Sequence, residues 1–142
     1  MNHVQQVLSR KGTNAVSVSP DTSVYEALRI MAEQNIGSVI VMDGDAYLGI
    51  VTERDYSRKV ILQNKHSNTT PVSEIMSSDL PHVSPEDTID QCMELMTKNN
   101  IRYLPVFNND RLAGIISMSD VVKDTILSQQ QTIRHLNEYL YS

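Results

Sequence analysis

The sequence predicts a mixed α/β protein, built from two tandem copies of a small βαββα unit that pack sheet to sheet as one pseudo-two-fold module. Two observations support this fold class. The chain repeats itself at a constant offset of 65 residues, so that Asp55 aligns with Asp120. Each copy also shows the same succession of strand, helix, hairpin and helix signals. Because a unit of about 60 residues buries little surface alone, we expect the two copies to share an interface.

The internal repeat runs without a gap from Ser19-Pro20 to Asp55 in the first copy, and from Ser84-Pro85 to Asp120 in the second. The residues of the first copy that recur unchanged are Ser19, Pro20, Met31, Asn35, Ile36, Val41, Asp45, Gly49, Ile50 and Asp55. Chance does not give ten identities at one register, so the pattern indicates a duplicated structural unit.

Each copy opens with a short apolar strand, expected at 16–18 and 82–83, that ends at the Ser-Pro pair. Proline fixes φ and lacks an amide hydrogen, so it stops the strand and opens a turn. A helix follows, capped by Thr22 or Ser23 in the first copy and by Asp87 or Thr88 in the second. Its apolar residues recur at i, i+3, i+4 and i+7, which predicts one buried face. These residues are Val24, Ala27, Leu28 and Met31, then Ile89, Cys92, Met93 and Met96.

Two aliphatic strands joined by a tight turn come next. We expect them at 38–42 and 47–52 around Asp43-Gly44, and at 103–107 and 112–117 around Asn108-Asn109. Asn, Asp and Gly tolerate the positive φ that two-residue hairpin turns require. A second helix begins near Glu53 and near Met118, which completes each βαββα unit.

The domain organisation follows from these elements. The expected parts are a short N-terminal helix (1–12), a first repeat (13–63), a linker with a short helix (64–77), a second repeat (78–127) and a C-terminal helical extension (128–142). In the last helix Ile126, Ile133 and Leu140 recur every seven residues beside Leu136, which gives a narrow apolar stripe. Docking onto the chain's own module and packing against a second chain explain this stripe equally well.

The charge balance argues against nucleic acid and membrane partners. Twelve basic and 17 acidic residues give a net charge of −5, and no basic run reaches five residues. Nucleic acids and anionic membranes both need a concentrated positive patch. The longest clean aliphatic run of the first half, 39–42, is far shorter than the roughly 18 residues of a membrane span. A single cysteine, Cys92, is expected in the core, and without a disulfide framework we expect a cytoplasmic protein. The four histidines lack metal-ligand spacing, so we expect no metal site.

The second hairpin strand of each copy enters its helix through the motif Gly-aliphatic-aliphatic-Thr/Ser-x-x-Asp, at 49–55 and 114–120. The free amide groups and partial positive charge of a helix N-terminus suit a phosphate. The carboxylate can accept two hydrogen bonds from a ribose diol. The same residues form a capping box if the hydroxyl residue caps the helix and the carboxylate returns the bond. The residues alone leave a ligand site and a structural cap as even alternatives.

Several of these motifs, in this order, resemble a CBS-domain pair, or Bateman module. In the second copy the resemblance rests on Asn100-Ile101, Leu104-Pro105-Val106 and the stretch from Gly114 to Lys123. The first copy, from Gly49 to Val60, is similar to that of small stand-alone bacterial pairs. The resemblance covers residues 12–123, nearly the whole chain. Such pairs form two clefts where the repeats meet, and many bind adenosine-containing ligands there.

The resemblance implies ribose contacts by Asp55 and Asp120, and ribose or phosphate contacts by Thr52 and Ser117. Arg102 stands where the family often places a phosphate-binding basic residue, whereas Gly37 stands there in the first copy. We therefore expect unequal clefts, with the stronger at Arg102. For the base the resemblance implies Thr13, Asn14 and Val16, and it completes the set with Gly37, Ser38, Arg54, Tyr103, Pro105, Met118, Ser119 and Lys123.

The function that the resemblance implies is that of a non-catalytic regulatory module. It would bind AMP, ADP, ATP or NAD(H) as an adenine nucleotide ligand in the cleft between the repeats, and transmit occupancy to a regulated partner protein. We expect a homodimer, because one chain leaves its sheet surfaces and the C-terminal apolar stripe uncovered. We expect no catalytic cofactor, since no nucleophile and base pair is visible in the sequence. The alternative is a purely structural dimerisation or protein-interaction module with empty clefts.

Overall fold

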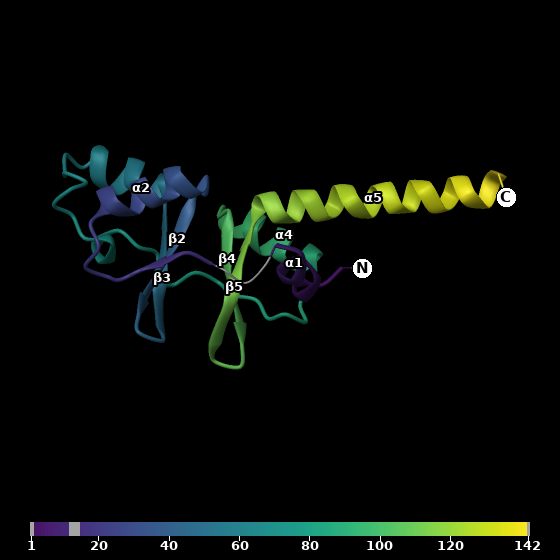
Figure 1. The fold of residues 1–142 in the computed structure, drawn as a ribbon, viewed down its shortest axis with the longest axis horizontal. Helices are drawn as coiled ribbons and strands as arrows, with labels where there is room; N and C mark the ends of the chain where they lie inside the picture. Colours follow the sequence, from purple (N-terminus) through teal and green to yellow (C-terminus); the bar gives the residue numbers. More distant parts are fainter. Residues whose placement is uncertain (1, 12–14, 142) are drawn as a thin grey trace. The chain divides into compact units, whose positions relative to one another are not determined.

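The computed structural model describes residues 2–11 and 15–141 and contains two compact units (Figure 1). The repeat 1 unit is Ala15–Leu80, and the repeat 2 unit combines Met1–Asn14 with Pro81–Ser142. Both units mix helices with a small sheet, which confirms the predicted α/β class.

The elements of the repeat 1 unit are β1 (Ser17–Val18), α2 (Val24–Gln34), β2 (Ser38–Asp43), β3 (Ala46–Thr52), α3 (Glu53–Tyr56), the π-helical turn η1 (Ser57–Ile61) and the 3₁₀ turn η2 (Val72–Glu74). Those of the repeat 2 unit are α1 (Val4–Lys11), α4 (Ile89–Asn99), β4 (Tyr103–Asn108), β5 (Arg111–Ser117) and α5 (Met118–Tyr141).

The repeat 1 unit has a three-stranded sheet in the order β1-β2-β3. β1 lies parallel to β2, and β2 pairs antiparallel with β3. The inward side chains of β2 and β3 and the apolar stripe of α2 form one core with residues of η1 and η2. Its central members are Val24, Ala27, Met31, Val39, Val41, Val51 and Val72.

The two stripe helices begin at one of the caps that the sequence predicts, and both end at a repeated asparagine. Ser23 caps α2 through its side chain, and Thr88 forms a capping box with Gln91 at the start of α4. Each helix ends at the repeated asparagine, Asn35 or Asn100, whose φ values of 55° and 53° are left-handed. Asparagine adopts this conformation more readily than other residues with a side chain, which explains the identity at this position.

The predicted buried stripe is confirmed at three of its four positions in each helix, and at i+4 Leu28 packs against the core only partly buried whereas Met93 is 37% exposed. The i+4 position therefore lies at the margin of the buried face rather than in the core. Cys92 is fully buried as predicted. Burial, helped by the charge of Asp87, raises the pKa of its thiol to about 11.

Both hairpin turns lie one residue later than the sequence predicts. Asp43 pairs with Ala46 and Asn108 pairs with Arg111, so the loops are 44–45 and 109–110. Their residues supply the positive φ that such turns require, with 59° at Gly44, 52° at Asn109 and 22° at Asp110. Asp43 and Asn108 can still pair as strand residues because the turn chemistry begins with the residue that follows.

In the described part of the repeat 2 unit, the sheet has two strands, β4 and β5. The strand predicted at 82–83 is reduced to a single parallel bridge between Val83 and Val106. Pro105 supplies a physical reason. In the repeat 1 unit the equivalent residue, Ile40, donates its amide to the carbonyl of Val16 at 3.0 Å. Proline has no amide hydrogen, so this bond of the edge strand has no counterpart in the second copy.

Each unit is completed by the segment that precedes the other repeat. α1, ahead of repeat 1, buries Val4, Val7 and Leu8 in the repeat 2 core. The segment that begins with η2, ahead of repeat 2, lies against β3 of repeat 1, where Ser77 and Ile50 exchange two backbone hydrogen bonds. The motif glycines allow both approaches. A Cβ at Gly49 would lie 2.7 Å from the Ser77 carbonyl oxygen, and one at Gly114 would lie 3.0 Å from Leu8 Cδ2.

The segment expected as a linker, 64–77, packs within the repeat 1 unit. The carbonyls of Ser67 and Thr70 accept hydrogen bonds from the amides of Tyr25 and Val24, at the start of α2. The short helix expected within this segment is the 3₁₀ turn η2. Among the described residues, no helix is both long enough and apolar enough to cross a membrane.

Candidate functional site

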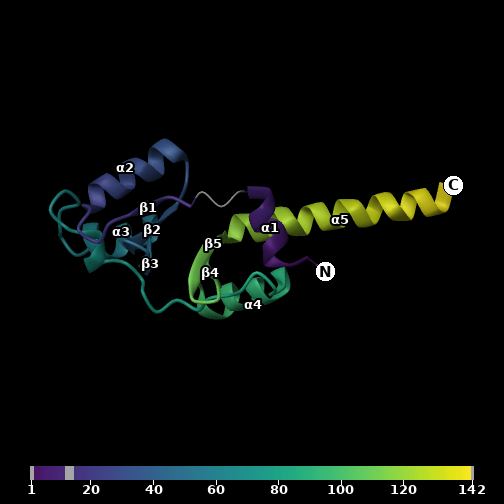
Figure 2. The ribbon, with the colours of Figure 1, turned by 60° about the horizontal axis from the view of Figure 1, so that its bottom comes forward.

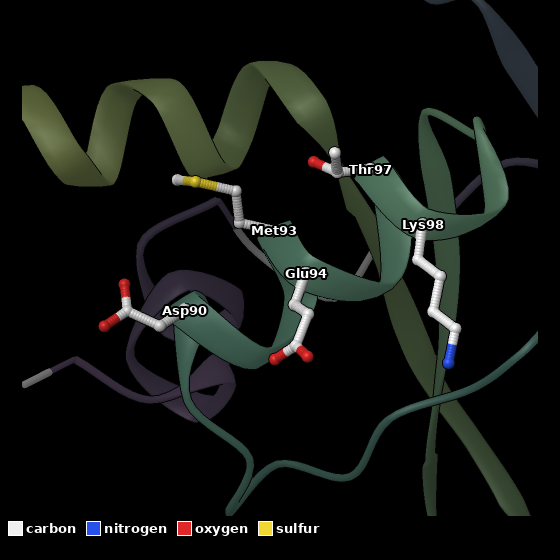
Figure 3. A pocket seen from close by; sticks show the side chains of 5 residues that line it. All are labelled: Asp90, Met93, Glu94, Thr97 and Lys98. Carbon is white, nitrogen blue, oxygen red and sulfur yellow. The ribbon is translucent and has the colours of Figure 1, made fainter.

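The candidate site residues gather at two strand-to-helix junctions, from β3 to α3 in the repeat 1 unit and from β5 to α5 in the repeat 2 unit. They do not coincide with the open hollow on the repeat 2 unit, which is lined by α4 alone (Figure 3). Its lining residues are Asp90, Met93, Glu94, Thr97 and Lys98. The junctions, rather than this hollow, carry the chemistry that the motif predicts.

The repeat 1 junction forms a complete capping box. The Thr52 hydroxyl accepts from the Asp55 amide at 3.1 Å, and Asp55 Oδ2 accepts from the Thr52 amide at 2.9 Å. The carboxylate is 11% exposed, and Lys59 Nζ lies 3.1 Å from its other oxygen, Oδ1. The same ammonium donates to the carbonyl of Ile75 at 2.9 Å. The cation of this junction therefore comes from the next turn of the same helical segment.

The repeat 2 junction has the same box but a different cation. The Ser117 hydroxyl accepts from the Asp120 amide at 3.1 Å, and Asp120 Oδ2 accepts from the Ser117 amide at 2.9 Å. Lys11, at the end of α1, donates to the same Oδ2 at 2.7 Å and to the carbonyl of Ile115 at 2.9 Å. A side chain from outside the repeat thus contacts the carboxylate that the motif predicts as a ribose ligand.

The Asp120 carboxyl titrates below its ordinary range. Burial acts to raise its pKa, but the hydrogen bonds from Lys11 and from Ser117, with the charge of Lys11, together outweigh burial and lower the pKa. The group is therefore a carboxylate at neutral pH, able to accept but not donate hydrogen bonds.

A charge reversal explains why the cations differ. The repeat position of Lys59 is held by Asp124 in the second copy, so α5 cannot supply its own cation there. Asp124 is itself buried and ion-paired with Arg10 at 2.5 Å. Asn2 donates its side-chain amide to both oxygens of this carboxylate, at 3.0 and 3.1 Å. The N-terminal segment therefore serves both carboxylates of the repeat 2 junction.

Gly37 and Arg102, which are equivalent residues of the two copies, lie beside these helix starts. The Gly37 carbonyl accepts from the amide of Glu53 at 3.3 Å, and the Arg102 carbonyl accepts from the amide of Met118 at 2.8 Å. The second of these bonds holds Arg102 at the N-terminus of α5, with its side chain exposed. The adjacent residues are paired across each hairpin, Ser38 with Thr52 and Tyr103 with Ser117.

The other predicted site residues lie at varying distances from these centres. Arg54, Ser119 and Met118 belong to the junction helices, with Ser119 exposed and Met118 packed against the core. Lys123 is exposed one helical turn beyond Asp120. Pro105 is buried within β4 opposite Ile115, and Val16 packs against the repeat 1 core. Thr13 and Asn14 lie outside the described residues.

Sequence reasoning missed Arg10, Lys11 and Asp124. The signal for Asp124 lies in the repeat itself, just past the window that ended at Asp120, where lysine is replaced by aspartate. Such a reversal shows that the second copy needs a cation from elsewhere. No local pattern shows that α1 supplies it.

The resemblance that the junction motifs suggest agrees with a comparison of the chain with models of protein families. A family model described as "CBS domain" matches residues 4–61 and 72–125, which together are most of the chain. The chain belongs to the CBS-domain family. Proteins built from CBS-domain pairs are generally non-catalytic regulatory modules. The matched ranges include α1 and η2, the two segments that pack on the opposite repeat.

Three similar proteins illustrate the range of this family. A solved structure of a protein with CBS domains from Burkholderia ambifaria is 44% identical, with a TM-score of 0.86, and the match covers 90% of this chain and 96% of that one. The mitochondrial CBS domain-containing protein CBSX3 of Arabidopsis thaliana is 34% identical, over 96% of this chain and 71% of its own. A hexameric CBS-CP12 protein from bloom-forming cyanobacteria is 28% identical, with a TM-score of 0.74, over 95% of this chain and 82% of that one.

Within the described part of the chain, no cluster of three or more His, Cys, Asp or Glu side chains is arranged to hold a metal ion. What the junctions offer chemically is a hydroxyl, a carboxylate with a low pKa at Asp120, and an exposed guanidinium at Arg102. These groups bind polyols and anions by hydrogen bonds.

Proposed function

We propose that this CBS-domain pair is a non-catalytic sensor that binds an adenine nucleotide, of the class of AMP, ADP, ATP or NAD(H), and passes its occupancy to a regulated protein. The supporting observation is that both junctions hold a hydroxyl and a carboxylate at a helix start, with Asp55 and Asp120 mostly buried but not closed off. A ligand would act by favouring one arrangement of the repeats over others.

The ribose is assigned to the carboxylates. At Asp120 the hydrogen bonds from Lys11 and Ser117 converge on Oδ2. We assign Oδ1 as the acceptor for a ribose hydroxyl, so that cap and ligand use different oxygens. At Asp55 the Oδ1 atom already lies beside Lys59, which favours the repeat 2 junction as the tighter site.

The phosphate is assigned to Arg102. Its carbonyl is tied to the first amide of α5, and its side chain is exposed beside that helix N-terminus. A guanidinium gives a phosphate a bidentate, charge-assisted partner in a protein whose net charge of −5 otherwise repels anions. Gly37 offers no such group, so the proposal includes two unequal sites.

We also propose that the functional oligomer is a homodimer and that it is located in the cytoplasm. The single cysteine is buried and unavailable for a disulfide, which supports a reducing compartment such as the cytoplasm.

A second function is favoured by one specific observation, the capping boxes themselves. Both motif carboxylates satisfy backbone amides at their helix starts, so a duplicated structural cap accounts for the repeat without a ligand. In that case the chain is a dimerisation or protein-interaction module with empty clefts.

A thermal-shift panel separates the two functions. The wild type and the double variant Asp55→Asn/Asp120→Asn are melted with AMP, ADP, ATP, NAD, NADH and S-adenosylmethionine. A ligand at 100 times its dissociation constant adds about 2.7 kcal/mol, a shift of several degrees. We expect at least one adenine nucleotide to raise the wild-type Tm and to have little effect on the double variant. If no compound shifts the wild type, the structural function is correct.

A further inference from the structure

The helix α5 continues well beyond the core of the repeat 2 unit. It has 24 residues, of which Val121 and Asp124 are buried, and every residue from Gln129 to Tyr141 is exposed. Figures 1 and 2 both show its C-terminal turns extending past the other elements of this unit. These turns lack the tertiary packing that supplies most helical stability in proteins, so a partner surface would stabilise them.

Five exposed apolar residues of α5, together with Gln129, follow a coiled-coil period. They fall at alternating intervals of four and three residues, and this seam consists of Val122, Ile126, Gln129, Ile133, Leu136 and Leu140. The other exposed hydrophobic residues of α5, Leu127, Tyr139 and Tyr141, lie outside the seam. Its five apolar members are 48% to 68% exposed. A spacing of 3.5 residues gives a narrow stripe suited to one other helix, whereas a helix that docks on a globular core carries a wider apolar face.

We propose that the seam of α5 pairs with the seam of a second copy of this chain, as a parallel two-stranded coiled coil in register. The spacing places Ile126, Ile133 and Leu140 at heptad position a, and Val122, Gln129 and Leu136 at position d. The central heptad, with Ile133 at a and Leu136 at d, has the combination that favours parallel two-stranded pairing.

Gln129 fixes the direction and register of the pair. In the parallel arrangement its amide meets the partner's Gln129, and each amide can donate a hydrogen bond to the other. In an antiparallel arrangement centred on the same segment, Gln129 would face isoleucine, which leaves a buried amide without a partner. Gln129 lies at position d, and any other register would leave its amide buried without a partner.

The positions that flank the seam carry no charge from Thr125 onward, so two identical helices meet without repulsion. They are Thr125, Gln130, Thr132, Asn137 and Tyr139. Two of the hydroxyls are satisfied within their own helix, since Thr125 donates to the Val121 carbonyl and Thr132 to the Ser128 carbonyl. A surface that is apolar, neutral and self-complementary suits a second copy.

Sedimentation equilibrium of the full chain tests the pairing. The seam variant Ile133→Glu/Leu136→Glu is compared with Gln131→Glu/His135→Glu, which adds the same charges on the opposite face of the helix. We expect the wild type to be dimeric, and the seam variant to raise the dimer dissociation constant by at least about tenfold, against less than about twofold for the control. A monomeric wild type, or equal losses in both variants, overturns the proposal. Thermal melting of each variant confirms that both variants are folded.

Cysteine cross-linking tests direction and register. The variant Leu140→Cys should form a disulfide-linked dimer under mild oxidation, because the two cysteines face each other near the end of the seam. Gln131→Cys, on the outer face, should link far more slowly. An antiparallel pair would place residue 140 opposite residue 122, about 27 Å from its own copy's equivalent. Absence of the 140–140 link in a dimeric protein would overturn the parallel assignment, since Cys92 is buried and does not compete.

Discussion

The two junctions share a motif but differ in how its carboxylate is held. In the repeat 1 junction the cation is Lys59, from the same helical segment as Asp55. In the repeat 2 junction that position is Asp124, and α1 supplies Arg10 for Asp124 and Lys11 for Asp120. The ion pair of the motif carboxylate is thus local in the first copy. In the second copy it depends on a segment about 100 residues away. A ligand at Asp120 would therefore contact a carboxylate that is coupled to α1, whereas one at Asp55 would not.

The largest effect should come from Arg10→Met. This change leaves the buried Asp124 carboxylate without its cation, and breaking a buried ion pair costs about 3–5 kcal/mol. Because Arg10 is half exposed, we expect the lower end, about 3 kcal/mol, in chemical unfolding. The matched change in repeat 1, Lys59→Met, removes an equally exposed cation from a carboxylate that is 11% rather than 4% exposed, so it should cost less, about 1 kcal/mol. Equal losses would remove the distinction between the junctions.

Asp120→Asn should weaken nucleotide binding by about ten- to a hundredfold, because a hydrogen bond to a charged acceptor contributes on the order of 1.5–3 kcal/mol. Isothermal titration calorimetry measures the affinity, and denaturation measures the loss of the cap, about 1 kcal/mol. Asp55→Asn should lose a similar amount of stability but less affinity. If Asp120→Asn loses stability alone, its carboxylate is only a cap.

Arg102→Ala should weaken AMP binding by about tenfold and leave adenosine almost unchanged, because only AMP offers a phosphate to the guanidinium. Arg111→Ala removes another exposed arginine from the same unit and serves as the control. A loss shared equally by adenosine and AMP would mean that Arg102 shapes the site rather than binding phosphate.

Lys11→Met should give the smallest effect, under about 1 kcal/mol, since Lys11 is partly exposed and screened by solvent. The folded pKa of Asp120 is depressed, so the stabilisation is complete above the unfolded pKa of about 3.9. It is lost as the pH falls through the folded pKa. The stability difference between wild type and variant should therefore be constant from pH 7 to about pH 5 and shrink below about pH 4. A difference that grows on acidification would contradict this ion pair, and Lys98→Met controls for general charge effects.

Much of the fold could be predicted because its signals are local. The Ser-Pro stops, the caps at Ser23 and Thr88 and the left-handed Asn35 and Asn100 depend on neighbours within a few residues. The capping box, one of the two alternatives for the motif, is also found in both copies. These features need no knowledge of tertiary packing.

What the sequence could not show depends on long-range contacts. The edge strand at Val83 fails because of Pro105, which lies in a different strand. The amphipathic residues of α1 predict a buried face but not which repeat will bury it. Lys11 reaches Asp120 only because α1 packs on repeat 2. The cation at Asp120 could therefore not be predicted from the sequence either.

The exchange of leading segments also constrains how the chain folds as it is made. α1 is synthesised before both repeats, yet Leu8 packs against Gly114, which emerges roughly 100 residues later. At about 5–20 residues per second, the apolar face of α1 must wait several seconds for its binding surface. The repeat 2 unit can therefore close only after β5 has left the ribosome. Contacts of such high sequence separation slow folding, so α1 is the part of the nascent protein that most needs protection from aggregation.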